Sequence, residues 1–185
     1  MAAYMDGPEV FVRGNTQDAV GNTMNGGRVV VYGNAGDTVG YAMRGGEIYI
    51  RGNVGYRVGI HMKEYEGKKP VIVIGGKAGD FLGEYMAGGV IILLGLGVRQ
   101  DEIVGSYCGT GMHGGTIYVR GSVDPNKLGK EVGVTTANEE DLELIRKHVE
   151  AFCRYFDTDW DKIMKKGFTK LYAYNKRPYG NLYAY

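Results

Sequence analysis

Ser106 and His113 are the two side chains that could serve as a nucleophile and its base. A serine hydrolase needs its hydroxyl within hydrogen-bond reach of a base, and these two residues lie seven positions apart in the chain. The other serine is Ser122, and neither serine stands in a Gly-x-Ser-x-Gly turn. Ser106 belongs to a polar loop, residues 97–108, whose simpler interpretation is a solvated insertion. The sequence therefore predicts no catalytic residue and keeps Ser106 and His113 as the pair that a hydrolase would need.

Residues 109–114 match Gly-x-Gly-x-x-Gly, the dinucleotide-binding pattern. That pattern works where a strand runs directly into a helix whose first amides hold the pyrophosphate. Here a strand-like segment, residues 117–120, follows the glycines instead. We therefore interpret these glycines as corners of a repeat, and we expect no cofactor.

The sequence offers few side chains that could bind a metal ion. His61, His113 and His148 are far apart, and Cys108 and Cys153 form no closely spaced pair of the kind that zinc sites use. His61 and His113 occupy neighbouring corner positions and could approach each other across the repeat, whereas Cys108 stands in an apolar position. The sequence predicts no metal site.

Composition narrows the class of partner. The 185 residues are 44% hydrophobic and 23% charged, with a net charge of +1. This balance does not favour nucleic acid or a membrane surface as the main partner. The first ten residues lack the basic and apolar regions of a signal peptide, and the longest apolar run is too short to cross a bilayer. A cytoplasmic protein is expected.

An excess of glycine, 32 residues, marks an internal repeat. Short β-branched segments that end in glycine recur along the first two thirds of the chain, and an apolar-Gly-x-x-Met pattern follows each of the first five. The methionines of this pattern are separated by 19, 19, 24 and 26 residues. They are Met24, Met43, Met62, Met86 and Met112. The extra length falls in loops, which a stack of repeats tolerates.

The repeat predicts an all-β fold. We expect a single-stranded right-handed β-helix (solenoid) of about six coils over residues 1–123, with residues 124–185 as a C-terminal helix and tail packing on the β-helix or on a partner. Side-chain alternation predicts two inner columns and a buried methionine column. The inner columns would be Val10, Val29, Ile48, Val71, Ile91 and Ile117, and beside them Val12, Val31, Ile50, Val73, Leu93 and Val119.

A third column would point outward although its members are apolar or aromatic: Phe11, Val30, Tyr49, Ile72, Ile92 and Tyr118. Such a stripe is normally covered, by the C-terminal segment of the same chain or by a partner protein. Thr136 and Glu139 are placed as a capping box for a helix that reaches Phe156, and a second short helix is expected over residues 158–166. The aromatic end of the chain, residues 168–185, shows no regular pattern.

The unit Gly-x-x-Met-x-Gly-Gly-x-Val/Ile-x-Val/Ile-x-Gly-Asn resembles the Gly-x-Gly-x-Gly domain that closes the large subunit of glutamate synthase. One of the subunits of formylmethanofuran dehydrogenase has a similar repeat. Residues 143–149 are similar to the helix that follows the repeat in glutamate synthase. Residues 168–171, with Tyr174 and Lys176, look like a shortened form of its end. The resemblance covers nearly the whole chain.

In glutamate synthase one domain hydrolyses glutamine and another, with FMN and an iron–sulfur cluster, reduces the iminoglutarate formed with ammonia. The repeat domain carries no catalytic residue. The resemblance thus implies a non-catalytic structural subunit of a split glutamate synthase, bridging glutamine amidotransferase and FMN/iron–sulfur synthase chains. Self-association of the chain stays open. The alternatives are a component like the repeat-bearing subunit of formylmethanofuran dehydrogenase, or a small independent hydrolase using the 97–108 loop.

Overall fold

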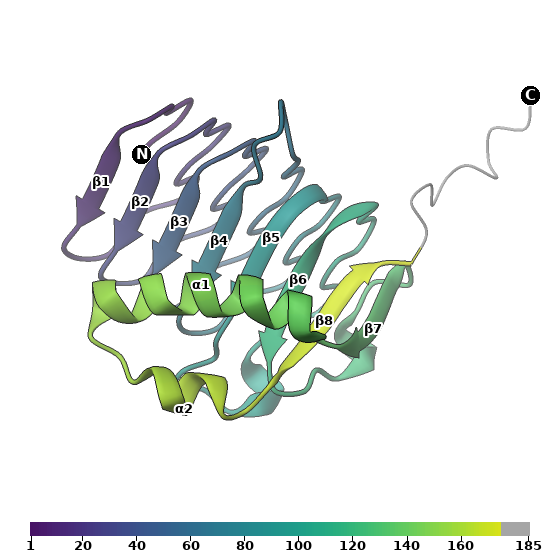
Figure 1. Cartoon of the computed structure of the whole chain (residues 1–185). Helices are drawn as coiled ribbons and strands as arrows, with labels where there is room; N and C mark the ends of the chain where they lie inside the picture. Colours follow the sequence, from purple (N-terminus) through teal and green to yellow (C-terminus); the bar gives the residue numbers. More distant parts are fainter. Residues whose placement is uncertain (175–185) are drawn as a thin grey trace, which may run out of the picture.

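The computed structural model describes residues 1–174, and its eight strands form one sheet in the order β1-β2-β3-β4-β5-β6-β8-β7 (Figure 1). Neighbouring strands from β1 to β6 run parallel, and β8 pairs antiparallel with both β6 and β7. The strands are β1 (Glu9–Val12), β2 (Arg28–Val31), β3 (Glu47–Ile50), β4 (Val71–Ile74), β5 (Ala87–Leu93), β6 (Gly114–Arg120), β7 (Val132–Thr136) and β8 (Phe168–Ala173). The helices are α1 (Glu139–Phe156) and α2 (Trp160–Met164), with short 3-10 turns at Gln100–Glu102 and Pro125–Lys127.

The prediction of an all-β, single-stranded right-handed β-helix is wrong. The structure has one open sheet that mixes parallel and antiparallel pairs, and an 18-residue helix lies along it (Figure 1). The sheet is mixed because of the segment after residue 124. Instead of forming a tail outside the repeats, it contributes β7 and β8 to the same sheet and so changes both its topology and its class.

The first repeats are held to one another by backbone hydrogen bonds and by asparagine side chains. The Asn34 side-chain oxygen accepts the Asn53 amide at 2.7 Å, as the Asn15 oxygen accepts the Asn34 amide at 2.8 Å. The glycine before each donating amide is required by the close approach of the accepting side chain. A Cβ on Gly52 would lie 2.2 Å from the Asn34 Oδ1, and real Cβ atoms do not approach this closely. Glycine therefore lets the asparagine of one repeat reach the backbone of the next.

The methionine column is buried as predicted: Met24, Met43, Met62, Met86 and Met112 are all fully inaccessible to solvent. The inner sheet columns are also confirmed, except in β4. There Ile72 and Ile74 pair with Ile48 and Ile50 and enter the inner core, whereas Val71 and Val73 face the helix. The sequence assignment was one residue out of register. All four residues of β4 are apolar, so alternation carried no information about which face is which.

Most of the outer stripe is covered by α1 of the same chain (Figure 1), whereas Phe11 at the edge of the sheet stays 49% exposed. Val30, Tyr49 and Val73 share one buried cluster with Ile145 and Phe152 of the helix. This packing agrees with the expectation that the C-terminal part of the chain covers the stripe. It stabilises both partners, because each would otherwise leave an apolar face in water.

The start of α1 differs from the predicted capping box. Asn138 is the N-cap and pairs reciprocally with Asp141, so that Thr136 and Glu139 do not form the box. Thr136 instead ends strand β7. The end of the chain also differs, because residues 168–173 form β8 rather than an irregular tail. Residues 175–185 lie outside the described residues, and the division of the chain at residue 123 stays a proposal.

Candidate interaction surface

The structure gives Ser106 and His113 separate surroundings. The Ser106 amide donates to the Asp80 carboxylate at 2.7 Å. His113 is exposed, and its Nδ1 lies 3.3 Å from the carbonyl oxygen of Gly111. Within residues 1–174 no hydrogen bond joins the Ser106 hydroxyl to the His113 ring. Their pairing as nucleophile and base stays a prediction.

The 97–108 loop is tied down at several points. Its 3-10 turn is closed by an Arg99–Glu102 ion pair of 2.6 Å, and both side chains are exposed. Ile103 and Val104 are buried in the inner core. Lys127 donates to the Val104 carbonyl at 2.8 Å and so fastens the loop to the segment that follows β6. The loop is a packed part of the repeat stack.

The histidines and cysteines lie apart from one another in different environments. His61 stacks on Tyr85 with ring centroids 5.4 Å apart. Cys108 is fully buried, and burial raises the pKa of its thiol to about 12, so the thiol stays protonated and unreactive. Cys153 lines a hollow of about 470 Å³ between α1 and α2. Among the described residues, no group of three His, Cys, Asp or Glu side chains could hold a metal ion.

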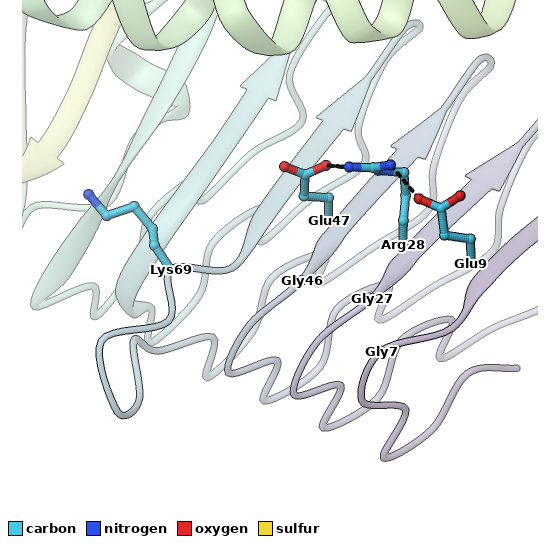
Figure 2. Close-up of a pocket in the computed structure, with 7 residues that line it drawn as sticks. All are labelled: Gly7, Glu9, Gly27, Arg28, Gly46, Glu47 and Lys69. Carbon is cyan, nitrogen blue, oxygen red and sulfur yellow. Dashed lines mark hydrogen bonds and ion pairs between the residues drawn. The ribbon is translucent and has the colours of Figure 1, made fainter.

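One polar cluster joins the sheet to the underside of α1. The Arg28 guanidinium donates to Glu47 at 2.9 Å and also pairs with Glu9 (Figure 2). The Tyr49 hydroxyl lies 3.3 Å from Glu47 and 3.0 Å from the Nδ1 of His148 on α1. Burial lowers the pKa of His148, and Glu47 opposes this only in part. Burial likewise raises the pKa of Tyr49. A neutral imidazole thus faces a neutral phenol beneath the helix.

The hollow beside this cluster, about 330 Å³, is bordered by Glu9, Arg28, Glu47 and Lys69 (Figure 2). Figure 2 shows the Arg28 guanidinium between the two carboxylates and Lys69 standing apart on the loop before β4. Because Arg28 is already neutralised by two acidic partners, the hollow offers no free guanidinium to an anionic ligand. These residues hold successive strands together.

A second polar cluster fixes the N-terminal end of α1. The Asp141 carboxylate accepts the Tyr118 hydroxyl at 2.6 Å and the Lys170 ammonium at 2.7 Å. Burial alone would raise the pKa of Asp141, but the hydrogen bonds from Lys170, Tyr118 and the Asn138 amide together lower it. One carboxylate therefore ties together β6, β8 and the helix N-terminus.

The loops behind the sheet carry the exposed aromatic side chains. Tyr41 packs edge-on to His61, which stacks on Tyr85, and in the adjoining column Phe81 stacks on Tyr107 at 5.0 Å. Tyr107 is 57% exposed. The Arg57 guanidinium lies over the Phe81 ring and pairs with Glu84 at 3.0 Å. We call this set the corner surface: Tyr41, Arg57, His61, Phe81, Tyr85 and Tyr107.

The corner surface was not recognised from the sequence, although a signal was present. Its members other than Tyr41 directly precede buried positions of the repeat, such as Leu82, Met86 and Cys108. All except Tyr41 have positive φ, between 52° and 63°. Large side chains rarely adopt this conformation, and it costs stability. Positive φ recurs at the equivalent corners of other repeats, where Ala19 and Thr38 stand, so the conformation belongs to the repeat and the exposed rings distinguish these corners.

The comparisons confirm the family that the repeat resembles. The chain matches the GXGXG motif family over residues 1–176, and it belongs to that family. It is 47% identical over 189 residues to the Uncharacterized protein MJ1350 of Methanocaldococcus jannaschii, an alignment that covers 99% of this chain and 72% of that protein.

A solved relative shares the fold. It is a chain in the X-ray structure of the formyltransferase/hydrolase complex (FhcABCD) from Methylorubrum extorquens in complex with methylofuran. The TM-score is 0.57 and the identity 24%, over 81% of this chain and 61% of that chain. Our chain thus spans about three fifths of the length of the solved one, and at this identity the likeness concerns the fold alone. Within residues 1–174, no helix is both long and apolar enough to span a membrane.

Proposed function

We propose that this chain is a non-catalytic structural subunit of a multi-subunit enzyme complex, comparable to the repeat-bearing subunit of formylmethanofuran dehydrogenase. Membership of the GXGXG family supports the proposal, as does the shared fold with a chain of the formyltransferase/hydrolase complex. The identity of the partner chains and of the reaction they catalyse belongs to the proposal.

The observation that carries the proposal is a contrast between the polar side chains, which contact one another, and the aromatic side chains, which face solvent. The ionisable groups beneath α1 are paired with one another and hold the helix to the sheet. The corner surface instead presents aromatic rings and an arginine to solvent, the residue types that dominate binding energy in protein interfaces. A neighbouring protein of the complex would pack against these rings.

The glutamate synthase interpretation is the second candidate. The repeat is common to glutamate synthase and to formylmethanofuran dehydrogenase. It therefore supports a bridging role between glutamine amidotransferase and FMN/iron–sulfur chains at the level of the family only. The solved neighbour favours the formylmethanofuran-type complex.

The test is to tag the chain at its native level of expression and to identify the proteins that purify with it. We expect components of a formyltransferase/hydrolase or formylmethanofuran dehydrogenase complex. Glutamine amidotransferase and FMN chains would support the second candidate instead. A chain that purifies alone and hydrolyses an ester, with activity lost in both Ser106→Ala and His113→Gln, would overturn the structural role.

A further inference from the structure

Strand β1 forms one edge of the sheet and bonds only to β2 among the described residues. The carbonyls of Pro8 and Val12 accept the amides of Arg28 and Tyr32 on the β2 side. In a parallel ladder alternate residues bond to the same neighbour. The backbone N–H and C=O groups of Glu9, Phe11 and Arg13 therefore face away from β2 and are free to pair with another strand.

The side chains at this edge have a self-complementary order. Glu9 and Phe11 are exposed on one side of the strand, while Val10 and Val12 are half-buried on the inner side; Arg13, which directly follows the strand, is also exposed. Phe11 is 49% exposed although it packs edge-on to Tyr155 of α1. An acidic residue, an aromatic residue and a basic residue thus alternate symmetrically about Phe11.

We propose that β1 pairs antiparallel with β1 of a second copy of this chain, with Phe11 on the two-fold axis. In this register Glu9 lies opposite Arg13 of the second copy, and Arg13 lies opposite its Glu9. The free N–H and C=O groups of Glu9, Phe11 and Arg13 fall in hydrogen-bonded positions of the new ladder. Val10 and Val12 face each other across the junction, so the inner cores of the two copies become continuous.

Charge selects this register over its neighbours. Glu9, Arg28 and Glu47 already form an ion-paired column of alternating sign across β1, β2 and β3. Pairing centred on Phe11 extends that alternation by placing the Arg13 of the second copy beside Glu9. A shift of the centre to Val10 or Val12 would instead set Phe11 opposite Glu9 or Arg13.

The opposite edge of the sheet lacks this order. Strand β7 has the sequence VGVTT, with no charged residue, and exposes Val134 and two threonines. Nothing in it specifies an antiparallel register with its own copy. Edge strands flanked by charges also occur as a protection against pairing, and the solution state distinguishes the two roles.

The first test compares the size of the chain and its variants by sedimentation equilibrium. We expect a dimer that Arg13→Glu converts to a monomer, because two acidic residues then face each other in both pairs. Arg51→Glu is the matched control. Arg51 directly follows β3 as Arg13 directly follows β1, and it is exposed too, so the variant stays a dimer. A wild-type chain that remains monomeric up to about 100 μM, or a dimer that Arg13→Glu leaves intact, overturns the proposal.

The second test fixes the register by cross-linking in a Cys153→Ala background, where the buried Cys108 does not interfere. Only a residue on the two-fold axis can bond to its own copy. A hydrogen-bonded pair separates the Cα atoms by about 5.5 Å, within the span of a disulfide. Phe11→Cys should therefore dimerise covalently. Glu9→Cys and Arg13→Cys should do so only when mixed with each other. Self-cross-linking at position 9 or 13 without cross-linking at 11 contradicts the proposed register.

Discussion

The two sides of the repeat stack use side chains in opposite ways. On the sheet side, Val30 and Ile92 are fully buried because α1 lies over them, and Phe152 of that helix is buried in the same cluster. On the loop side, the rings of Tyr85 and Tyr107 remain 37% and 57% exposed. The chain therefore satisfies its apolar outer stripe by itself and leaves an aromatic surface open. This difference places the expected partner on the loops and a stabilising role on the helix.

The largest loss of stability is expected from a change in the inner core, which the sheet and the loops share. Met43 is fully buried between the sheet and the loops, so Met43→Asp buries an unpaired charge and should leave the chain unfolded or insoluble. Circular dichroism and soluble yield measure this. Lys68→Asp is the control, because the exposed Lys68–Asp6 pair contributes little. Similar melting temperatures for the two variants would refute the core assignment.

The second largest loss of stability is expected where α1 packs on the sheet. Phe152 is fully buried, packs on Phe156 with centroids 4.6 Å apart, and approaches the backbone at Gly75. Phe152→Ala should lower the free energy of unfolding by about 3–5 kcal/mol, measured by urea denaturation. Glu150→Ala, an exposed change on the same helix, should alter it by less than about 0.5 kcal/mol. Equal effects would mean that α1 does not seal the sheet.

A fall in pH should weaken the packing of α1 on the sheet before it affects the loops. The pKa of His148 is lowered by burial in the folded chain, so the unfolded chain binds a proton first as the pH falls. The stability linked to His148 is complete above its unfolded pKa, about 6.5, and is lost as the pH falls below that value. Urea denaturation at pH 7.5 and pH 5.5 measures the loss. His148→Gln should flatten this dependence, whereas His113→Gln on the exposed corner should not.

The smallest effect on stability is expected at the corner surface. Tyr107 has a φ of 61°, which asparagine tolerates better than tyrosine. Tyr107→Asn should therefore change the free energy of unfolding by less than about 1 kcal/mol. The same variant should reduce the recovery of partner chains in co-purification, whereas Tyr65→Asn, in the loop before β4, should not. Unchanged recovery in both variants would remove the corner surface from the interface.

The sequence by itself determined the repeat, the buried methionines and most of the sheet register. These features follow from local rules, because alternation sets the facing of a strand and glycine marks the corners where φ is positive or a neighbouring asparagine approaches. Gly52 and Asn34 show how local the reason is: the contact joins equivalent positions in successive repeats. The family expectation rested on the same pattern.

The tertiary structure decided the fold class, the facing of β4 and the site. Residues 168–173 alternate poorly and became a strand only because β6 and β7 offered free backbone groups. Val71 and Ile72 are equally apolar, so only pairing with β3 could select their faces. The corner surface joins Arg57, Phe81 and Tyr107, residues 24 and 26 positions apart. These residues hold equivalent repeat positions, but their contact depends on the stacking of successive repeats, which propensity and alternation within one repeat do not show.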